Sequence, residues 1–447
     1  MKKRSELFFI VGFVCLSSCG IINNDKSKYH TVVWLNYDNS LLYKDTKVVE
    51  GEMPVYKGET PTKPKNEEYS YAFVGWSPDV VPAYINATYV ARYSICYDLS
   101  VTSEDDNKGT ASIISGRGIL GETIVVEATP TNDYAFYGWY QGLSKVSDDL
   151  TYSFEMPNSN YSLVAKFITQ TEALELGIIP VIDDANQALT YGLYPQKNVD
   201  DSALITSLNA LTTPESNGWY LYNNEYYAKL IADPFDKSYV FDNGTTIVKG
   251  TTYWFKCEPI TWNILSNNNG EYYLLSSTLL DAHRFDDDSN NYKDSEIRAW
   301  LNNEFYNSAF AFNSGYIKTT NVDNSASTTH SNSNPNVCED TQDKVFLPSY
   351  KDYLNESYGF TSSTNRTELR ICKTTDWARA KGTWNNYNYT GGYWTRSPNN
   401  GNKQTKYVWD ISESGEVFDS GTLNTDTFSV SYTGNCVRPA IVLSIKD

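Results

Sequence analysis

The 447-residue sequence predicts a multidomain, β-rich protein in which two small repeats precede a larger α+β domain. Aromatic residues make up 15% of the chain, with 36 Tyr and 11 Trp, and such residues favour pleated, half-buried strands. A hexapeptide ending in Gly-Trp occurs twice, at residues 71–76 and 134–139, which indicates an internal repeat. Helical spacing of apolar residues joins the strand patterns only after about residue 175.

The first eighteen residues have the pattern of a secretory leader. Residues 2–4 are basic, and residues 7–15 form an apolar run. A membrane-spanning helix needs roughly 20 apolar residues, so this run is too short to span and fits the apolar part of a signal peptide. We therefore predict a signal peptide over residues 1–18 and a polar tether over residues 19–29.

A cysteine follows the leader directly. Residues 16–19 read Leu-Ser-Ser-Cys and resemble the lipobox of bacterial lipoproteins. The resemblance implies cleavage before Cys19 and a diacylglycerol on its thiol, and two acyl chains hold a protein firmly where one does not. The expected partner is the membrane, and the expected location is the extracellular face of the bacterial cell membrane. The alternative is an ordinary signal peptide with a chance cysteine.

The charge balance excludes one class of partner. The chain has 36 Lys and Arg against 54 Asp and Glu, a net charge of −18. Nucleic-acid-binding surfaces depend on clustered basic residues, so we predict no nucleic-acid partner. The same balance argues against a chain that lies flat on anionic lipid.

The two repeats emerge when the chain is aligned with itself. Residues 71–76 and 134–139 share Tyr-Ala-Phe-x-Gly-Trp, and a similar closing strand follows each copy. Glycine allows backbone conformations closed to other residues, and an adjacent tryptophan can fill most of a small core. We therefore interpret Trp76 and Trp139 as core residues, with ligand platforms as the alternative.

The first copy, residues 30–94, resembles the Listeria–Bacteroides repeat, also called the internalin B-type repeat. The resemblance rests on its opening strand, the Pro-rich residues 60–64 and the Gly-Trp strand. It implies a small β-grasp-like domain that serves as a stalk segment in surface proteins. The second copy, residues 95–169, is similar to a divergent relative of the same repeat.

The remaining residues, 170–447, mix helical and strand-like segments, which indicates an α+β domain. Helices are expected over residues 201–212, 294–306 and 349–355, and strands over residues 272–276 and 407–411. Asp294 or Ser295 can cap the second of these helices.

This part of the chain resembles an uncharacterised bacterial family, the domain of unknown function DUF6273. The matching blocks lie at residues 192–196, 259–265, 297–302, 343–349, 393–398 and 437–440. Their order is similar to that of the C-type-lectin-like fold and, within it, of formylglycine-generating enzymes and their non-enzymatic relatives. The resemblance implies a C-type-lectin-like domain.

The sequence assigns no catalytic residue. Formylglycine-generating enzymes bind copper through two cysteines a few residues apart, whereas Cys372 and Cys436 are 64 positions apart. The three histidines, His30, His283 and His330, have no metal or triad spacing. An oxidase that uses the two cysteines, or a hydrolase that uses acidic residues, stays open as an alternative.

Cysteine pairing and metal binding also stay open. Five cysteines remain after the leader and Cys19, so at least one is unpaired, and the sequence cannot rank the pairings of Cys257, Cys338, Cys372 and Cys436. Residues 286–288 with Asp294 are oxygen donors of the kind that Ca²⁺ prefers. Acidic runs are usually solvated and the spacing fits no calcium loop, so we predict no cofactor and keep Ca²⁺ as the alternative.

The candidate ligand-binding residues are Trp394 and Arg396. The first interpretation of Arg298, Arg396 and Arg438 is structural, as buried arginines bonded to backbone carbonyls, and a ligand-facing Arg396 beside Trp394 is the alternative. Residues 318–343 form a long polar stretch, and long loops are often functional.

These observations lead to one expected function. The chain is expected to be a lipid-anchored surface protein whose repeat stalk displays a C-terminal binding or adhesion head for a glycan or protein ligand. The alternatives are an extracytoplasmic enzyme and a non-binding structural spacer of the cell envelope. The ligand-binding expectation rests partly on fold analogy, which by itself does not fix function.

Overall fold

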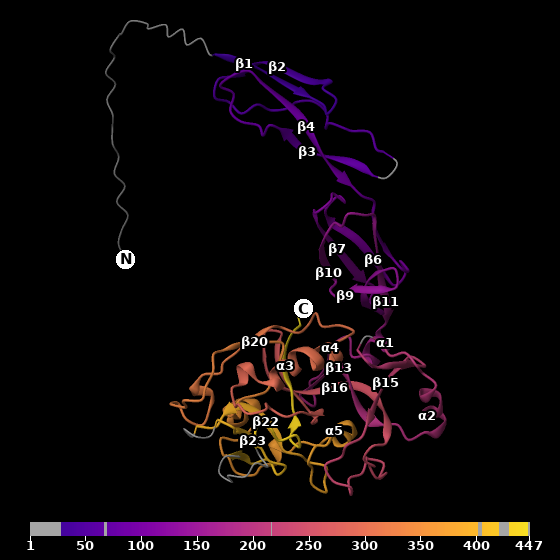
Figure 1. Ribbon diagram of the computed structural model, residues 1–447, viewed down its shortest axis with the longest axis vertical. Coiled ribbons are helices and arrows are strands. Elements are labelled where there is room, and N and C mark those ends of the chain that lie inside the picture. The colour runs from indigo at the N-terminus through magenta and orange to yellow at the C-terminus, as the bar shows by residue number, and fades with distance from the viewer. Residues whose placement is uncertain (1–27, 67–68, 216, 401–404, 420–428, 446–447) are drawn as a thin grey trace, which may run out of the picture. The chain divides into compact units, whose positions relative to one another are not determined.

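The computed structural model describes residues 28–66, 69–215, 217–400, 405–419 and 429–445 (Figure 1). The predicted signal peptide and Cys19 lie outside these residues. Among the described residues, no helix is long and apolar enough to cross a membrane. The chain forms two compact units, the first holding residues up to Asp98 together with residues 117–122 and 155–160, and the second holding the rest.

The first unit is built on a four-stranded sheet. Its strands are β1 (Tyr29–Leu35), β2 (Leu41–Val49), β3 (Ser70–Ser77) and β4 (Ala87–Cys96). They lie in the order β2-β1-β4-β3, and the central pair β1 and β4 is parallel while the outer pairs are antiparallel. Trp34 is buried at the centre of the core and contacts Trp76, with ring centroids 4.5 Å apart.

The second repeat begins the second unit with two small sheets. Its strands are β5 (Leu99–Ser103), β6 (Gly109–Ser115), β7 (Thr123–Pro130), β8 (Tyr134–Gln141), β9 (Ser144–Ser147), β10 (Thr151–Glu155) and β11 (Tyr161–Thr169). One sheet has the order β10-β7-β6, and the other has the order β5-β11-β8-β9. As in the first repeat, the opening and closing strands, β5 and β11, pair in parallel.

The Gly-Trp pair makes the same bulge in both repeats. Gly75 has φ +133° and Gly138 has φ +148°, values that L side chains rarely adopt. At each site the strand pairing skips the residue before the glycine, so the following tryptophan turns inward. Trp139 is fully buried and Trp76 is half-buried against the core, which confirms the core interpretation of both residues.

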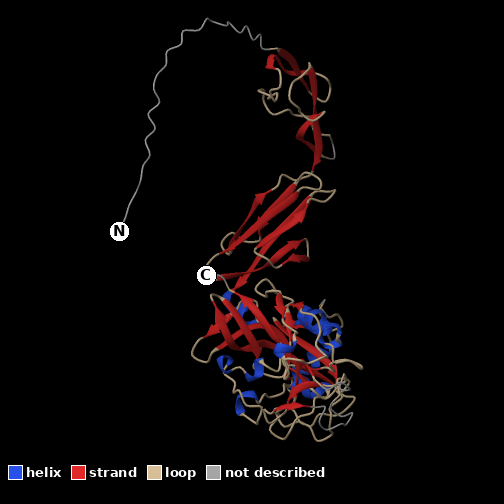
Figure 2. Cartoon of the chain, turned by 90° about the vertical axis from the view of Figure 1, so that its left-hand side faces the viewer, coloured by secondary structure: helices blue, strands red, loops and turns tan. Residues whose placement is uncertain are grey.

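The larger domain centres on an eight-stranded sheet. Its strands are β12 (Val181–Asp183), β13 (Ala188–Asn198), β14 (Tyr220–Tyr222), β15 (Glu225–Ile231), β16 (Thr252–Asn268), β17 (Glu271–Ser276), β21 (Val345–Phe346) and β26 (Ala440–Ser444). The main path has the order β12-β13-β16-β17-β26-β21, and β15 branches from the long strand β16. Strands dominate the whole chain and helices are few and short (Figure 2).

A five-stranded sheet carries the C-terminal blocks of the sequence. Its strands are β18 (Asp281–Ala282), β22 (Tyr393–Pro398), β23 (Val408–Ile411), β24 (Val417–Asp419) and β25 (Cys436–Val437). They lie in the order β18-β25-β22-β23-β24. A further pair joins β19 (Thr320–Val322) to β20 (Thr341–Asp343).

The main predicted helix is confirmed. Helix α3 (Glu296–Trp300) begins after Ser295, whose side chain accepts the N–H of Arg298, and the helical run continues through Leu301–Phe305 to α4 (Tyr306–Ala309). Its apolar residues face the core of the domain, because Ile297, Leu301 and Phe305 are buried.

The other helices are short. They are α1 (Gln170–Glu175), α2 (Ser202–Asn209) and α5 (Asp376–Lys381). Helix α2 confirms the first predicted helix, and Asp201 caps it at the N–H of Leu204. The third predicted helix, residues 349–355, is wrong except for a single turn at Asp352–Leu354, because the backbone is extended at Asn355 and ends the turn there.

Candidate ligand pocket

The predicted ligand residue Trp394 lies inside the core. Its side chain is fully buried, and its indole Nε1 donates to the carbonyl of His283 at 2.8 Å. Its ring packs against Phe285, with centroids 6.0 Å apart. The structure therefore corrects the ligand-binding prediction for Trp394, because a ring with no exposed face cannot stack on a ligand.

Arg396 is also buried, with 7% of its surface exposed. Its guanidinium donates to the carbonyl of Leu347 at 2.9 Å and to that of Asp323 at 3.1 Å, and it pairs with Asp352 at 3.1 Å. The first interpretation, an arginine bonded to backbone carbonyls, describes these contacts. Arg396 borders a shallow polar hollow, but its guanidinium already holds three segments of the chain together.

The other arginines of the sequence blocks have the same structural role. Arg298 donates to the carbonyl of Lys293 at 2.8 Å and to Asp343 at 2.7 Å. Arg438 donates to the carbonyl of Ser276 at 3.0 Å and to the Tyr393 hydroxyl at 2.9 Å.

The long polar stretch over residues 318–343 is held against the domain. It contains β19 and β20, and Asn334 and Asn336 donate to the carbonyls of Pro398 and Asn399 at 2.8 and 2.7 Å. Among the residues that the structure describes, no large apolar side chain of this stretch is exposed. The stretch therefore offers no aromatic platform for a ligand.

The candidate oxidase chemistry lacks a reactive thiol. Cys372 and Cys436 are both buried free thiols, and burial raises the pKa of each above its usual value. A nucleophilic or copper-binding cysteine needs the thiolate, which burial disfavours. Within the described part of the chain, no group of three or more His, Cys, Asp or Glu residues could hold a metal ion.

The acidic run at residues 286–288 makes contacts within the protein. Asp286 accepts the N–H groups of Asp288 and Ser289, both at 3.1 Å, so it closes its own turn. Arg284 pairs with Asp287 and with Glu296. These contacts engage Asp286 and Asp287, two of the four carboxylates of the calcium alternative, and Asn291 donates to a third, Asp294, at 2.9 Å.

A pocket that the sequence did not single out lies beside β23 and β24. It has a volume of 340 Å³, within the range of small-molecule sites. Four aromatic side chains line it: Phe235, Trp384, Phe418 and Tyr432. Its polar lining includes Asp410, Glu413 and Glu416, together with Asn435 and Arg366. We call it the Asp410 pocket.

Several segments position this lining. The turn between β23 and β24 carries Glu413 and Glu416, and the Ser412 N–H bonds to the carbonyl of Glu416 at 2.9 Å. Gly415 in this turn has φ +76°, and a Cβ there would meet the carbonyl oxygen of Thr367. The backbone N–H of Trp384 donates to the carbonyl of Gly434 at 2.7 Å. This bond holds the segment of Trp384 beside the segment of Asn435, and both residues line the pocket.

Asp410 is the chemically unusual member of the pocket. Only 4% of its surface is exposed, and its Oδ2 accepts a bond from the Asn435 amide at 3.3 Å. No described residue donates to its Oδ1. Burial raises the pKa of the Asp410 carboxyl to about 8, with Asp419 and Glu413 adding to the rise and the Asn435 bond opposing it. Asp410 is therefore protonated at neutral pH.

The sequence does contain a signal for Asp410. The four residues of β23, Val-Trp-Asp-Ile, are all buried, so the strand is covered on both faces. A carboxyl group in such an apolar run needs a partner or a function, because burying a polar group without a hydrogen bond is costly. The aromatic walls come from distant segments, and no local pattern brings them together.

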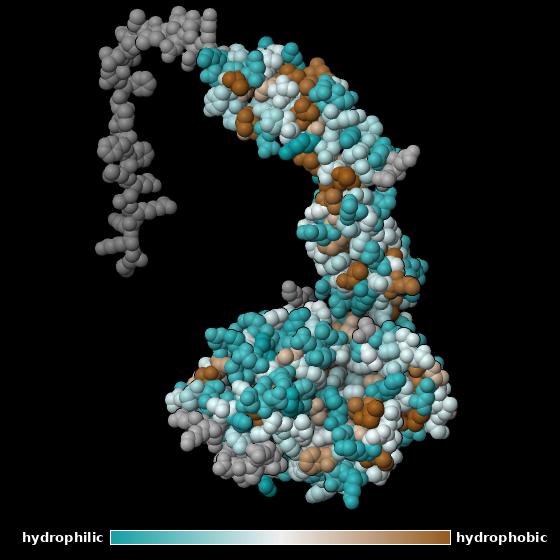
Figure 3. Space-filling view, viewed as in Figure 1, coloured by the Kyte–Doolittle hydropathy of each residue, from teal (hydrophilic) through white to brown (hydrophobic). Residues whose placement is uncertain are grey.

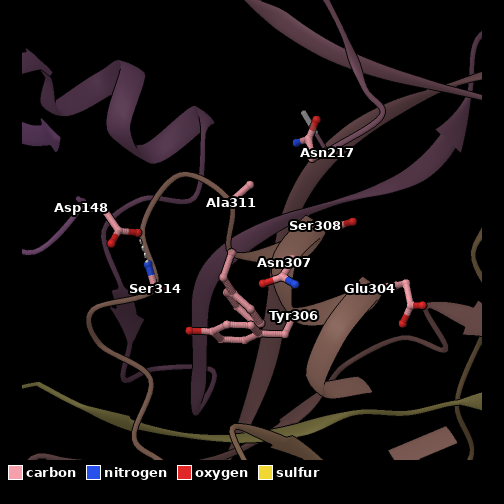
Figure 4. Close-up of a pocket in the computed structure, with 9 residues that line it drawn as sticks. Asp148, Asn217, Glu304, Tyr306, Asn307, Ser308, Ala311 and Ser314 are labelled. Carbon is pink, nitrogen blue, oxygen red and sulfur yellow. Dashed lines mark hydrogen bonds between the residues drawn. The ribbon is translucent and has the colours of Figure 1, made fainter. Parts of the chain in front are cut away.

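A second hollow, of 480 Å³, lies where the second repeat meets the larger domain (Figure 4). Asp148 accepts the Ser314 N–H at 2.8 Å across it, and Tyr306 accepts a bond from Lys344 at 2.6 Å. Beside it, Lys145 donates to the carbonyl of Phe312 at 2.6 Å. The bonds of Asp148 and Lys145 join the repeat to the domain, so we interpret the hollow as part of a structural joint.

Comparison with known families identifies two parts of the chain. Residues 99–171 match the divergent InlB B-repeat domain, and residues 269–445 match the domain of unknown function DUF6273. The predicted similarity of the second repeat to internalin B-type repeats and of the larger domain to DUF6273 is thereby confirmed. The chain is a multidomain, mostly β protein with these two kinds of domain.

No curated protein matches the chain. One solved structure, the streptococcal SHIRT domains 3-4 from a cell surface protein, aligns at 8% identity over 31% of this chain and 96% of that chain. The TM-score of this alignment is 0.12.

Proposed function

We propose that this chain is a lipid-anchored bacterial surface protein whose repeats carry a ligand-binding C-terminal domain. The lipobox-like residues 16–19 support the anchor, and residues 99–171 support the surface location through their similarity to the InlB B-repeat family. The β-grasp-like and C-type-lectin-like assignments belong to this proposal. The parallel pairing of the opening and closing strands in both repeats favours the β-grasp-like assignment.

The Asp410 pocket is the observation that carries the ligand-binding role. Aromatic rings can stack on the apolar faces of sugar rings, and buried carboxyl and amide groups orient the hydroxyls, so the pocket suits one saccharide unit. The ligand of this proposal is therefore a glycan. Most of the visible face of the domain is hydrophilic, which suits a domain surrounded by water (Figure 3).

Binding of the soluble chain, residues 20–447, to a glycan array with and without Ca²⁺ tests the proposal. Saturable binding should be lost in Trp384→Ala and weakened in Asp410→Asn. Tyr387→Ala is the matched control, because Tyr387 is 89% exposed and does not line the pocket. Binding that survives both pocket variants would overturn the glycan-binding role, and so would the absence of binding to every glycan on the array.

The anchor is tested separately from the head. Wild-type chain expressed in a bacterial host should incorporate an alkyne-tagged fatty acid and remain with the membrane fraction. Cys19→Ser should lose the label, while Cys96→Ser should keep it. Equal labelling of wild type and Cys19→Ser would contradict the lipid anchor and leave the ligand-binding role untouched.

A glycoside hydrolase is the second candidate function. A carboxyl group with a raised pKa is suited to general-acid catalysis, and Asp410 has this property. Release of reducing sugar from an array-positive glycan, abolished in Asp410→Asn, would favour the hydrolase. Binding without turnover would favour the binding domain.

A further inference from the structure

We propose that the ligand group held beside Asp410 is a protonated amine, so that the preferred ligand is an amino sugar with a free ammonium group. This inference rests on the proposed glycan-binding role of the same pocket. It is carried by three observations: the charges that line the pocket, its aromatic walls and the unpaired oxygen of Asp410.

The charged groups of the pocket favour a cation. Three carboxyl groups, Asp410, Glu413 and Glu416, line it against one arginine, Arg366. That arginine pairs with Glu416 at 3.6 Å at the exposed rim. The carboxyl groups of Asp410 and Glu413 have no basic partner among the described lining residues, so an anionic ligand would be repelled and a cation attracted.

The aromatic walls suit the same group. Phe235 and Tyr432 meet edge to face, with ring centroids 6.3 Å apart, and Trp384 and Phe418 complete the aromatic lining. Aromatic faces attract ammonium groups, because the face of the ring carries negative potential. A pocket that combines such rings with carboxyl groups stabilises an ammonium group more than a neutral hydroxyl.

The unpaired oxygen shows where the ammonium group would bind. Asp410 Oδ2 is already bonded to Asn435, while Oδ1 is buried and has no donor among the described residues, so a ligand reaches it when the side chain turns toward the pocket. An ammonium N–H donates to this oxygen and balances the charge of the ionised carboxylate. A sugar hydroxyl can donate to the same oxygen while the carboxyl stays protonated, so it gains a hydrogen bond but no ion pair.

Binding of a cation should also release a proton. The pKa of Asp410 is about 8, so the carboxyl must ionise when a cation binds near neutral pH. Asn435 faces it from the segment before β25, Glu413 and Asp419 from the β23–β24 hairpin, and Glu416, Arg366 and Tyr432 lie around the pocket. For a permanently charged ligand, affinity should rise by up to about tenfold per pH unit below pH 8 and level off above it.

Calorimetric titration of the soluble chain, residues 20–447, tests this inference. At pH 7, where its amine is largely protonated, glucosamine should bind at least about tenfold more tightly than N-acetylglucosamine or glucose, because acetylation removes the positive charge. Methylguanidinium, which keeps its charge at every pH used, should bind more tightly at pH 8 than at pH 6. Asp410→Asn should abolish both the preference for the amine and the pH dependence, and Tyr387→Ala should change neither.

The outcomes separate the two proposals. Equal binding of glucosamine and N-acetylglucosamine, both lost in Trp384→Ala, would overturn the amine preference and keep the glycan-binding role. Binding of methylguanidinium with no binding of any sugar would support the cation site and overturn the glycan-binding role. No binding of any of these probes at millimolar concentration would overturn both.

Discussion

Two buried ionisable side chains, Arg370 and Asp410, lie near the turn that joins β23 to β24, and their hydrogen-bond partners differ. Arg370 is fully buried, and all five of its N–H groups donate to backbone carbonyls, at 2.6 to 3.3 Å. Its Nε bonds the carbonyl of Gly415 in the turn. Asp410 is nearly as buried but accepts a single side-chain bond. A complete set of partners marks Arg370 as structural, whereas the incomplete set of Asp410 leaves it available to a ligand.

The largest expected effect is the loss of Arg370. Arg370→Met should lower the free energy of unfolding by at least about 3 kcal/mol, because five carbonyls in a buried site lose their donor. Arg370→Lys keeps the charge but supplies fewer donors, so it should lower stability by less. Urea unfolding followed by tryptophan fluorescence measures both. If Arg370→Met lowers the free energy of unfolding by less than about 1 kcal/mol, the full set of partners of Arg370 would not distinguish it from Asp410.

The next effect is a pH dependence that comes from Asp410. Its folded pKa, about 8, lies above its unfolded value, so its stabilising contribution is full below about pH 4 and is lost as the pH rises to about 8. In wild type this group lowers the free energy of unfolding by up to about 1.4 kcal/mol per pH unit over that range. Asp410→Asn should lack this slope. Parallel stability profiles for the two proteins between pH 5 and 8 would contradict the buried, neutral carboxyl.

The smallest effect is expected at the pocket rim. Arg366 and Glu416 are exposed, with 74% and 41% of their side chains accessible, and such ion pairs contribute about 0–1 kcal/mol. Arg366→Ala should therefore leave the urea midpoint almost unchanged. If Arg366→Ala lowers the free energy of unfolding by more than about 2 kcal/mol, the rim ion pair would stabilise the fold as a buried group does, and Arg366 would not differ from Arg370.

The sequence predicts much of the local structure. Apolar spacing and a capping serine predict the helix that begins at Glu296, and strand-like runs of apolar and aromatic residues predict β17 and β23. The repeated Gly-Trp pair predicts the two tryptophan-centred cores, because the bulge depends on a local backbone property of glycine. These features depend on residues close together in the chain.

The candidate site depends on distant residues and was not predicted. Trp394 and Arg396 are prominent by residue type, but all six residues of β22 are buried, and this strand lacks the alternation of a half-exposed one. The walls of the Asp410 pocket come from segments as far apart as Phe235 and Tyr432, so only the tertiary fold brings them together.

The position of β26 has a consequence for how the chain is made. This strand, close to the C-terminal end of the described residues, pairs with β17 on one side and with β21 on the other. Until it has been synthesised, β17 has an open edge and β21 has no partner, and open strand edges invite pairing with other chains. The larger domain therefore closes only after residues 440–444 have been synthesised, and a chain that stops short of Ala440 is prone to aggregation.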